Sequence, residues 1–182
     1  MLNLQLLRKS ASRLVCRLIV DKPLSTKPFQ ERPHILLLRW DAKLGDAIVS
    51  SFFYREARKL NARVTVITVK ELAKMHESTF GADEVIITTP NPGPMKLRKL
   101  AGQLRNVDVV VHLVGRLQPA EIFFIHLIKP AHLYSLDDSL RCVNHKMGFA
   151  ANTLNIVEQY QFVLNDLGGK AYPYSIHHCV TG

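Results

Sequence analysis

A short polar turn between two apolar segments holds the residues best suited to chemistry. It reads DAKLGD over residues 41–46 and offers two carboxylates, a lysine and a single glycine. A phosphate-binding turn would need G-x-G-x-x-G or GxxxxGK[ST], and neither pattern is present. Asp46 also places a negative charge where a helix N-terminus would otherwise attract an anion, so a bound phosphate would meet like-charge repulsion. The turn is therefore a poor phosphate site.

Two roles are open to Asp46 on its residue type and position. As an N-cap or first-turn acid, it would stabilise the following helix by about 1 kcal/mol. As an exposed carboxylate at a ligand-binding edge, it could accept a proton from a sugar hydroxyl. Arg39 and Lys43 could likewise be solvated charges, and Asp41 could be a turn residue. The residues alone favour the capping role for Asp46.

The elements that must position this turn alternate between strands and helices. The run His34–Trp40 is continuously apolar, which is typical of a strand buried on both faces. Further strands are expected at 63–69, 84–88, 108–114 and 131–136, and helices at 46–60, 71–79, 95–104, 118–128 and 153–167. This alternation predicts an α/β fold, a Rossmann-like parallel sheet with helices on both faces. Ligands of such sheets bind at the carboxyl ends of strands, which here carry DAKLGD, TTPNPGP (88–94) and VGRLQP (114–119).

Composition limits the classes of function. The chain has 182 residues and a net charge of +9, and residues 1–32 alone hold seven Lys/Arg against two Asp/Glu. The charge is thus concentrated in the leader, which argues against a nucleic-acid surface on the rest. Three scattered cysteines without CxxC spacing disfavour disulfides and zinc and fit a reducing cytoplasm. The cluster His177-His178-Cys179 is a poor metal site, and His112, inside an apolar strand, is expected to be a core or edge histidine.

The first twenty residues can form an amphipathic helix. One side carries an apolar series and the opposite side carries a basic series, namely Leu4, Leu7, Ala11, Leu14 and Leu18 against Lys9, Arg13 and Arg17. Such a helix could lie in a membrane interface, could pack on the domain with its basic face in water, or could be a cleaved targeting peptide. The proline-rich segment that follows reads as a linker. We therefore expect a leader and linker at 1–32 and a folded domain at 33–170.

The turn and several later segments resemble the family 9 glycosyltransferases, the ADP-heptose:lipopolysaccharide heptosyltransferases. Their opening pattern is a hydrophobic strand, then R-x-D-x-x-G-D, then a helix. It stands here as LRWDAKLGD over 38–46, with one more residue in the turn than the commonest form. Further matches follow in order along the chain: ARVTVIT (62–68), ADEVIIT (82–88), VDVVVHLVG (107–115), KMGF (146–149) and VLNDLGG (163–169).

The resemblance implies a GT-B fold, in which two Rossmann-like domains face each other across a cleft. The N-terminal domain receives the acceptor, the lipid A–core oligosaccharide, and the C-terminal domain binds the donor, ADP-heptose. The family's second aspartate, which is Asp46 here, acts as the general base of an inverting displacement. The substrate-binding positions carried over are Arg39, Asp41, Lys43, Gly45 and Arg116. Lys43 and Arg116 could contact acidic sugars or phosphates of the acceptor, although the residues alone favour a solvated surface charge for Arg116. No cofactor, metal or nucleic acid is implied.

Some features depart from the family pattern. Phe52 stands where many members have a proline, and Asn155 stands where they often have a histidine. Residues 171–182 are expected to begin an interdomain linker, so the donor-binding domain is not within this sequence and transfer by these residues alone is not expected. The resemblance predicts a transferase at the cytoplasmic face of the inner membrane, where residues 1–20 could touch the membrane surface. The alternative is a non-catalytic module that binds the acceptor glycolipid or a partner protein.

Overall fold

The domain is built on one parallel sheet. The computed structural model describes residues 2–25, 27–41 and 43–169, and for residues 2–10 the backbone only. The strands are β1 (His34–Arg39), β2 (Arg63–Val69), β3 (Glu84–Thr88), β4 (Val109–His112), β5 (His132–Ser135) and β6 (His145–Lys146). They lie in the order β3-β2-β1-β4-β5-β6, and every neighbouring pair is parallel. The predicted Rossmann-like fold is confirmed.

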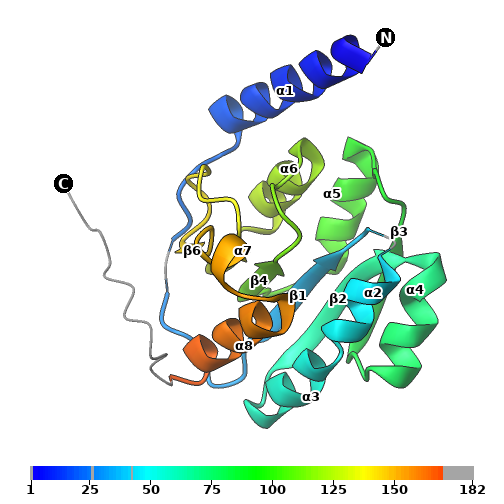
Figure 1. Ribbon diagram of the computed structural model, residues 1–182, viewed down its shortest axis with the longest axis vertical. Coiled ribbons are helices and arrows are strands. Elements are labelled where there is room, and N and C mark those ends of the chain that lie inside the picture. Colours follow the sequence, from blue (N-terminus) through cyan, green and yellow to red (C-terminus); the bar gives the residue numbers. More distant parts are fainter. Residues whose placement is uncertain (1, 26, 42, 170–182) are drawn as a thin grey trace.

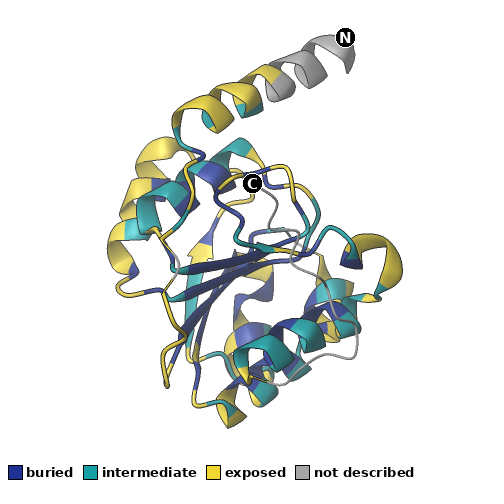
Figure 2. Ribbon diagram, turned by 90° about the vertical axis from the view of Figure 1, so that its left-hand side faces the viewer, coloured by how far each residue is buried: buried dark blue, intermediate teal, exposed yellow. Residues whose placement is uncertain are grey.

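Helices cover both faces of the sheet (Figure 1). They are α1 (Leu2–Ile19), α2 (Leu44–Val49), α3 (Phe52–Lys59), α4 (Lys70–Lys74), the single π-helical turn η1 (Met75–Thr79), α5 (Pro94–Gln103), α6 (Pro119–Ile128), α7 (Ala150–Thr153) and α8 (Ile156–Leu167). Alternate residues of β1 divide the core: Ile35 and Leu37 pack with α3 and α8, while Leu36 and Leu38 pack with α5 and α6. Figure 2 shows the resulting buried strands between two helical layers.

The structure differs from the predicted elements at a few places. The helix expected at 46–60 is broken into α2 and α3, because Ser50 turns its hydroxyl back to the carbonyl of Ala47 at 3.1 Å and Ser51 donates to Ile48. Such back-bonding by serine competes with the regular helical pattern. The short elements β6 and α7 were not predicted, since two and four residues are too few to show a periodicity.

The face of helix α1 that meets the domain is the one that carries Arg13 and Arg17, and not the one that carries Leu14 and Leu18. Arg13 and Arg17 contact the domain, whereas Leu14 and Leu18 point to solvent. The interpretation in which α1 packs on the domain is confirmed, but its basic residues are not simply solvated, because Arg13 is half-buried and both arginines bond the domain, although Arg17 stays exposed. No helix in the described part of the chain is both long enough and apolar enough to cross a membrane.

Candidate functional site at the carboxyl edge of the sheet

The strand order creates a crevice between β1 and β4. From β1 the chain proceeds through β2 and β3 on one side, and then crosses to β4, β5 and β6 on the other. The loops that leave β1 and β4 therefore run in opposite directions at the carboxyl edge, where open α/β sheets bind their ligands. These loops are residues 40–43 and 113–118, and they overlap two of the three segments singled out in the sequence, 41–46 and 114–119.

A pocket of about 280 Å³ lies at this crevice. Its walls come from the ends of β1 and β4, from the loop after β3 and from the start of α6. The lining residues are Leu38, Trp40, Asp41, Lys43, Pro90, Asn91, His112, Val114, Arg116, Gln118, Ala120 and Glu121. The structure thus brings Asp41, Lys43 and Arg116 together, although Arg116 is far from the other two in sequence.

Arg39 lies beneath the turn and outside the pocket lining. It ends β1 with its side chain buried, and its Nη1 lies 3.5 Å from the Tyr160 hydroxyl. Its Nε lies 3.6 Å from Asp41 Oδ1, which is an ion-pair distance but too long for a hydrogen bond. Burial lowers the pKa of Arg39, but Tyr160, Asp41 and Asp46 more than offset this, so the pKa is raised and the guanidinium stays charged.

Asp46 and Gly45 lie in the first turn of α2, beside the pocket lining. Asp46 is half-buried and is close enough to influence the charge of Arg39, but it makes no hydrogen bond or ion pair within the described residues. Its placement in the first turn agrees with one of the two sequence interpretations, but Asp46 is not the N-cap, which is Lys43. A Cβ on Gly45 would meet no atom within 4 Å, so the space above this turn is open.

Buried polar atoms without partners are concentrated at this edge. Eight such side-chain atoms occur among the described residues, and six of them belong to residues at or just after the ends of four neighbouring strands. They are Arg39 Nε and Nη2, Asp41 Oδ2, Thr68 Oγ1, Thr88 Oγ1 and His112 Nδ1. An unpartnered buried polar group costs about 1–3 kcal/mol, so this many at one edge indicates a place where a polar ligand or water completes the bonding.

Sequence reasoning missed a hydrogen-bonded group on the wall of the pocket. Glu121 accepts from the Trp40 indole at 2.6 Å and lies 3.3 Å from His112 Nε2. Burial raises the pKa of Glu121, but His112, Trp40 and the Gln118 amide hold it below its ordinary value. The resulting carboxylate orients His112, whose Nδ1 has no described partner. The one available signal was a histidine at the end of an apolar strand, which the sequence interpretation treated as structural.

A second buried polar group lies between α3 and η1, where the charge of Arg39 affects it. The Tyr54 hydroxyl lies 2.7 Å from His76 Nδ1, and both side chains are buried. Burial, and then the charge of Arg39, lower the pKa of His76 to about 4, so this histidine is neutral at physiological pH. A neutral imidazole beside a buried guanidinium avoids like-charge repulsion.

A larger hollow of about 1220 Å³ lies at the opposite edge of the sheet, between the 20–32 segment and the amino ends of the strands. It is an open groove beneath a connecting segment, and ligands of this fold class bind at the other edge. Within the described residues no three His, Cys, Asp or Glu side chains are grouped to hold a metal. The proposed linker at 171–182, with His177, His178 and Cys179, lies outside the described residues.

The fold is similar to that of a solved glycosyltransferase. The glycosyl transferase family 9 structure from Veillonella parvula matches with a TM-score of 0.60 and 17% identity, over 79% of this chain and 44% of that chain. The chain therefore has the fold of one half of a GT-B enzyme. The O-GlcNAc transferase from Thermobaculum terrenum matches with a TM-score of 0.46 and 12% identity, over 64% of this chain and 22% of that chain. No protein-family model and no curated protein sequence matches the chain.

Proposed function

We propose that the chain is the acceptor-binding half of an inverting glycosyltransferase of the heptosyltransferase type. It would serve the transfer of heptose, or a related sugar, from an ADP-sugar to the lipopolysaccharide core. The observation that carries the proposal is the row of unpartnered buried polar groups at the carboxyl edge, next to a turn that bears a half-buried carboxylate. A fold shared with a family 9 transferase supports the same conclusion.

Asp46 is the proposed general base. Its carboxylate would take the proton of an acceptor hydroxyl while that oxygen bonds to the anomeric carbon of the donor sugar. The bond from this carbon to the ADP oxygen breaks on the opposite face, so the configuration inverts and the electron pair leaves with ADP. General-base assistance of this kind contributes about 10²–10⁴-fold to rate.

The pocket residues would hold the acceptor in place for this step. Lys43 and Arg116 supply cations for acidic sugars or phosphates of the core, and Asp41 accepts from sugar hydroxyls. Arg39 would act from beneath by holding Asp41, and Gly45 would leave room for a sugar ring above the turn. The positions of the side chains at one edge of the sheet and the family resemblance together support these proposed roles.

The donor site belongs to a second domain in this proposal. The matched part of this chain spans less than half of the family 9 structure, and ADP-sugar binding is assigned to the other half of the GT-B cleft. Residues 33–170 would form the acceptor domain, 1–32 a leader and linker, and 171–182 the start of the interdomain connection. The acceptor is lipid-linked, which would place the protein at the cytoplasmic face of the inner membrane.

The test is a pair of calorimetric titrations of the 182-residue chain. We expect a water-soluble, deacylated lipid A–core oligosaccharide to bind, and Lys43→Gln or Arg116→Gln to weaken binding about tenfold through the loss of a charged contact. Lys96→Gln, an exposed lysine on α5, is the matched control and should bind as the parent does. The assignment would be contradicted if ADP-heptose bound with an affinity comparable to that of the oligosaccharide. It would also be contradicted if both pocket variants bound the oligosaccharide as tightly as the parent does.

A non-catalytic acceptor-binding module is the second candidate. The observation in its favour is that every residue lining the pocket comes from this one domain, so glycolipid could be held without a donor. Replacement of Asp46 separates the two candidates, because a pure binding module would not need a base there.

A further inference from the structure

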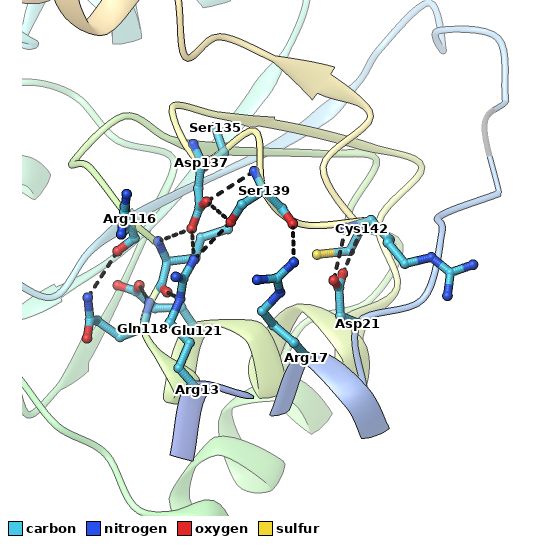
Figure 3. A network of polar contacts seen from close by, with 12 residues as sticks. Arg13, Arg17, Asp21, Arg116, Gln118, Glu121, Ser135, Asp137, Ser139 and Cys142 are labelled. Atoms are coloured by element: carbon cyan, nitrogen blue, oxygen red, sulfur yellow. Dashed lines mark hydrogen bonds and ion pairs between the residues drawn. The ribbon is translucent and has the colours of Figure 1, made fainter. Parts of the chain in front are cut away.

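Two arginines fix the orientation of α1 (Figure 3). Arg13 donates from Nε to the carbonyl of Leu117 at 3.2 Å, and its Nη2 bonds the Asp137 carboxylate and Ser139 Oγ. Arg17, one turn later, donates to the carbonyl of Ser139 at 2.9 Å. Both cations therefore point toward the loop that follows β5.

The end of the helix is held by an acid. Asp21 is buried and accepts from the backbone N–H groups of Arg141 and Cys142 at 3.0 and 2.8 Å. Cys16 and Val20 pack against the core layer that includes α6. These contacts occupy one side of α1 and determine which side faces away.

The opposite side of α1 is apolar and unpacked. Leu14, Val15, Leu18 and Ile19 are exposed by 56%, 52%, 79% and 64%. We call these four side chains the apolar stripe. A surface helix normally turns such residues inward, and burying each large side chain would contribute about 1.5–3 kcal/mol in a folding context. Figure 1 shows α1 projecting past the domain, with this part of the helix coloured as exposed in Figure 2.

The charges around the stripe identify the surface that it fits. Between residues 11 and 30 the one acidic side chain is Asp21, which is buried, whereas Lys22, directly after the helix, and Lys27 are exposed. An apolar stripe on a helix that exposed cations follow in the chain, and that cannot span a bilayer, matches an anionic membrane interface. We propose that the apolar stripe of α1 inserts into the surface of an anionic bilayer, with Arg13 and Arg17 serving as clamps on the domain rather than as headgroup ligands.

The clamp links the membrane surface to the pocket. Arg13 holds the carbonyl of Leu117, and the residues on either side of it, Arg116 and Gln118, line the pocket. A helix lying in the interface would therefore hold this wall of the pocket close to lipid headgroups. This last link rests on the proposed function, because it is useful only if the acceptor is anchored in lipid, whereas binding of the stripe to a bilayer does not depend on it.

The test is co-sedimentation of the full chain with two kinds of vesicle, phosphatidylcholine alone and phosphatidylcholine with an equal part of phosphatidylglycerol. We expect binding to the mixed vesicles, much weaker binding to phosphatidylcholine, and a loss of about tenfold or more in partitioning for Leu14→Gln/Leu18→Gln. Met95→Gln removes an equally exposed apolar side chain on α5 and should bind as the parent does. Both leucines are exposed, so thermal unfolding of the double variant should match the parent.

Several outcomes would overturn the proposal. The double variant could bind the mixed vesicles as well as the parent does, the parent could bind both kinds of vesicle equally, or the parent could bind neither. A dimeric parent and a monomeric double variant without vesicles would show that a second copy covers the stripe. Neither donor nor acceptor sugar is present, so a failure here leaves the oligosaccharide titration unaffected, and a failure of that titration leaves this assay unaffected.

Discussion

The carboxyl edge of the sheet and the α1 interface contain similar residues, but their hydrogen bonding differs. Both pair an arginine with an aspartate and nearby hydroxyl groups. At the α1 interface Arg13 and Asp137 bond directly, and Asp137 also accepts from the Leu117 amide and from Ser139. At the carboxyl edge Arg39 Nε lies 3.6 Å from Asp41, and two nitrogens of Arg39 have no hydrogen-bond partner.

The difference separates a finished structural contact from an unfinished site. None of the unpartnered buried atoms in the described residues belongs to the α1 interface, whereas six belong to the carboxyl edge. A network in which every polar group has a hydrogen-bond partner stabilises the fold. A network that contains buried donors and acceptors without partners can bind a polar ligand through them. Four predictions test this contrast, beginning with the largest expected effect.

The first prediction concerns the base at the carboxyl edge. In a chain that includes the donor-binding domain, Asp46→Asn should lower turnover by about 10²–10⁴-fold and leave the free energy of unfolding nearly unchanged. Single-turnover kinetics with ADP-heptose and acceptor would measure the effect, with Glu77→Gln, an exposed acid on η1, as the control. Near-parent turnover by Asp46→Asn would remove the residue from the mechanism.

The second prediction concerns the satisfied network. Asp137→Ala should lower the free energy of unfolding by about 2–4 kcal/mol, because Arg13 and the buried Leu117 amide both lose their acceptor. The neighbouring Asp138→Ala removes one exposed acceptor for the Gly148 amide and should cost about 1 kcal/mol or less. Urea unfolding distinguishes them, and equal losses for the two variants would contradict the contrast.

The third prediction concerns the pH dependence of stability that comes from His76, whose pKa is lowered in part by the charge of Arg39 at the carboxyl edge. The pKa of His76 is about 4 in the folded chain and about 6.5 when unfolded, so the unfolded chain binds more protons between these values. Stability should therefore fall by about 2–3 kcal/mol as the pH drops through this window, and His76→Gln should flatten the slope.

The α1 interface should respond at a lower pH. Burial raises the pKa of Asp137, but Ser139 and Arg13 hold it below its ordinary value. Its stabilising contribution is thus present above a pH of about 3.9 and is lost as the pH falls through the lowered value. Hydrogen exchange near pH 5 should show opening around His76 with the Leu117 amide still protected, and simultaneous opening of both would argue against two separate regions.

The smallest expected effect is a change in the free energy of unfolding that has opposite signs for two variants. Thr68→Val removes a buried hydroxyl without a described partner and should raise the free energy of unfolding by about 1 kcal/mol. Ser135→Ala removes a buried hydroxyl that accepts from the Asp137 amide and should lower it by a similar amount. Thermal unfolding measures both, and stabilisation by Ser135→Ala or destabilisation by Thr68→Val would reverse the distinction.

Much of the site could be located from the sequence, because its position depends on the order of strands and helices along the chain. The alternation of apolar strands with amphipathic helices predicts a parallel sheet, and a parallel sheet brings the ends of its strands to one edge. The turn at 41–46 and the segment at 114–119 therefore had to lie near each other, and Asp41, Lys43 and Arg116 do line one pocket. Their roles in binding stay predictions, as does the role of Asp46.

The contacts that depend on distant partners could not be predicted. Glu121 bonds Trp40 across 81 positions, and Arg13 bonds Asp137 across 124. A period in the sequence shows that a helix has two unlike faces, but it does not show which face meets the domain.

The sequence by itself determined the elements, their order and the edge at which chemistry could occur, because hydrophobic period and turn composition are local properties. Only the tertiary structure decided that Arg13 and Arg17 of α1 bond the domain while the apolar stripe faces outward. The physical reason is that the loop after β5 offers a buried carboxylate and free carbonyl oxygens, and two arginines satisfy these groups better than leucines could. It likewise decided that the polar groups of one region are paired, whereas those of the other are left open.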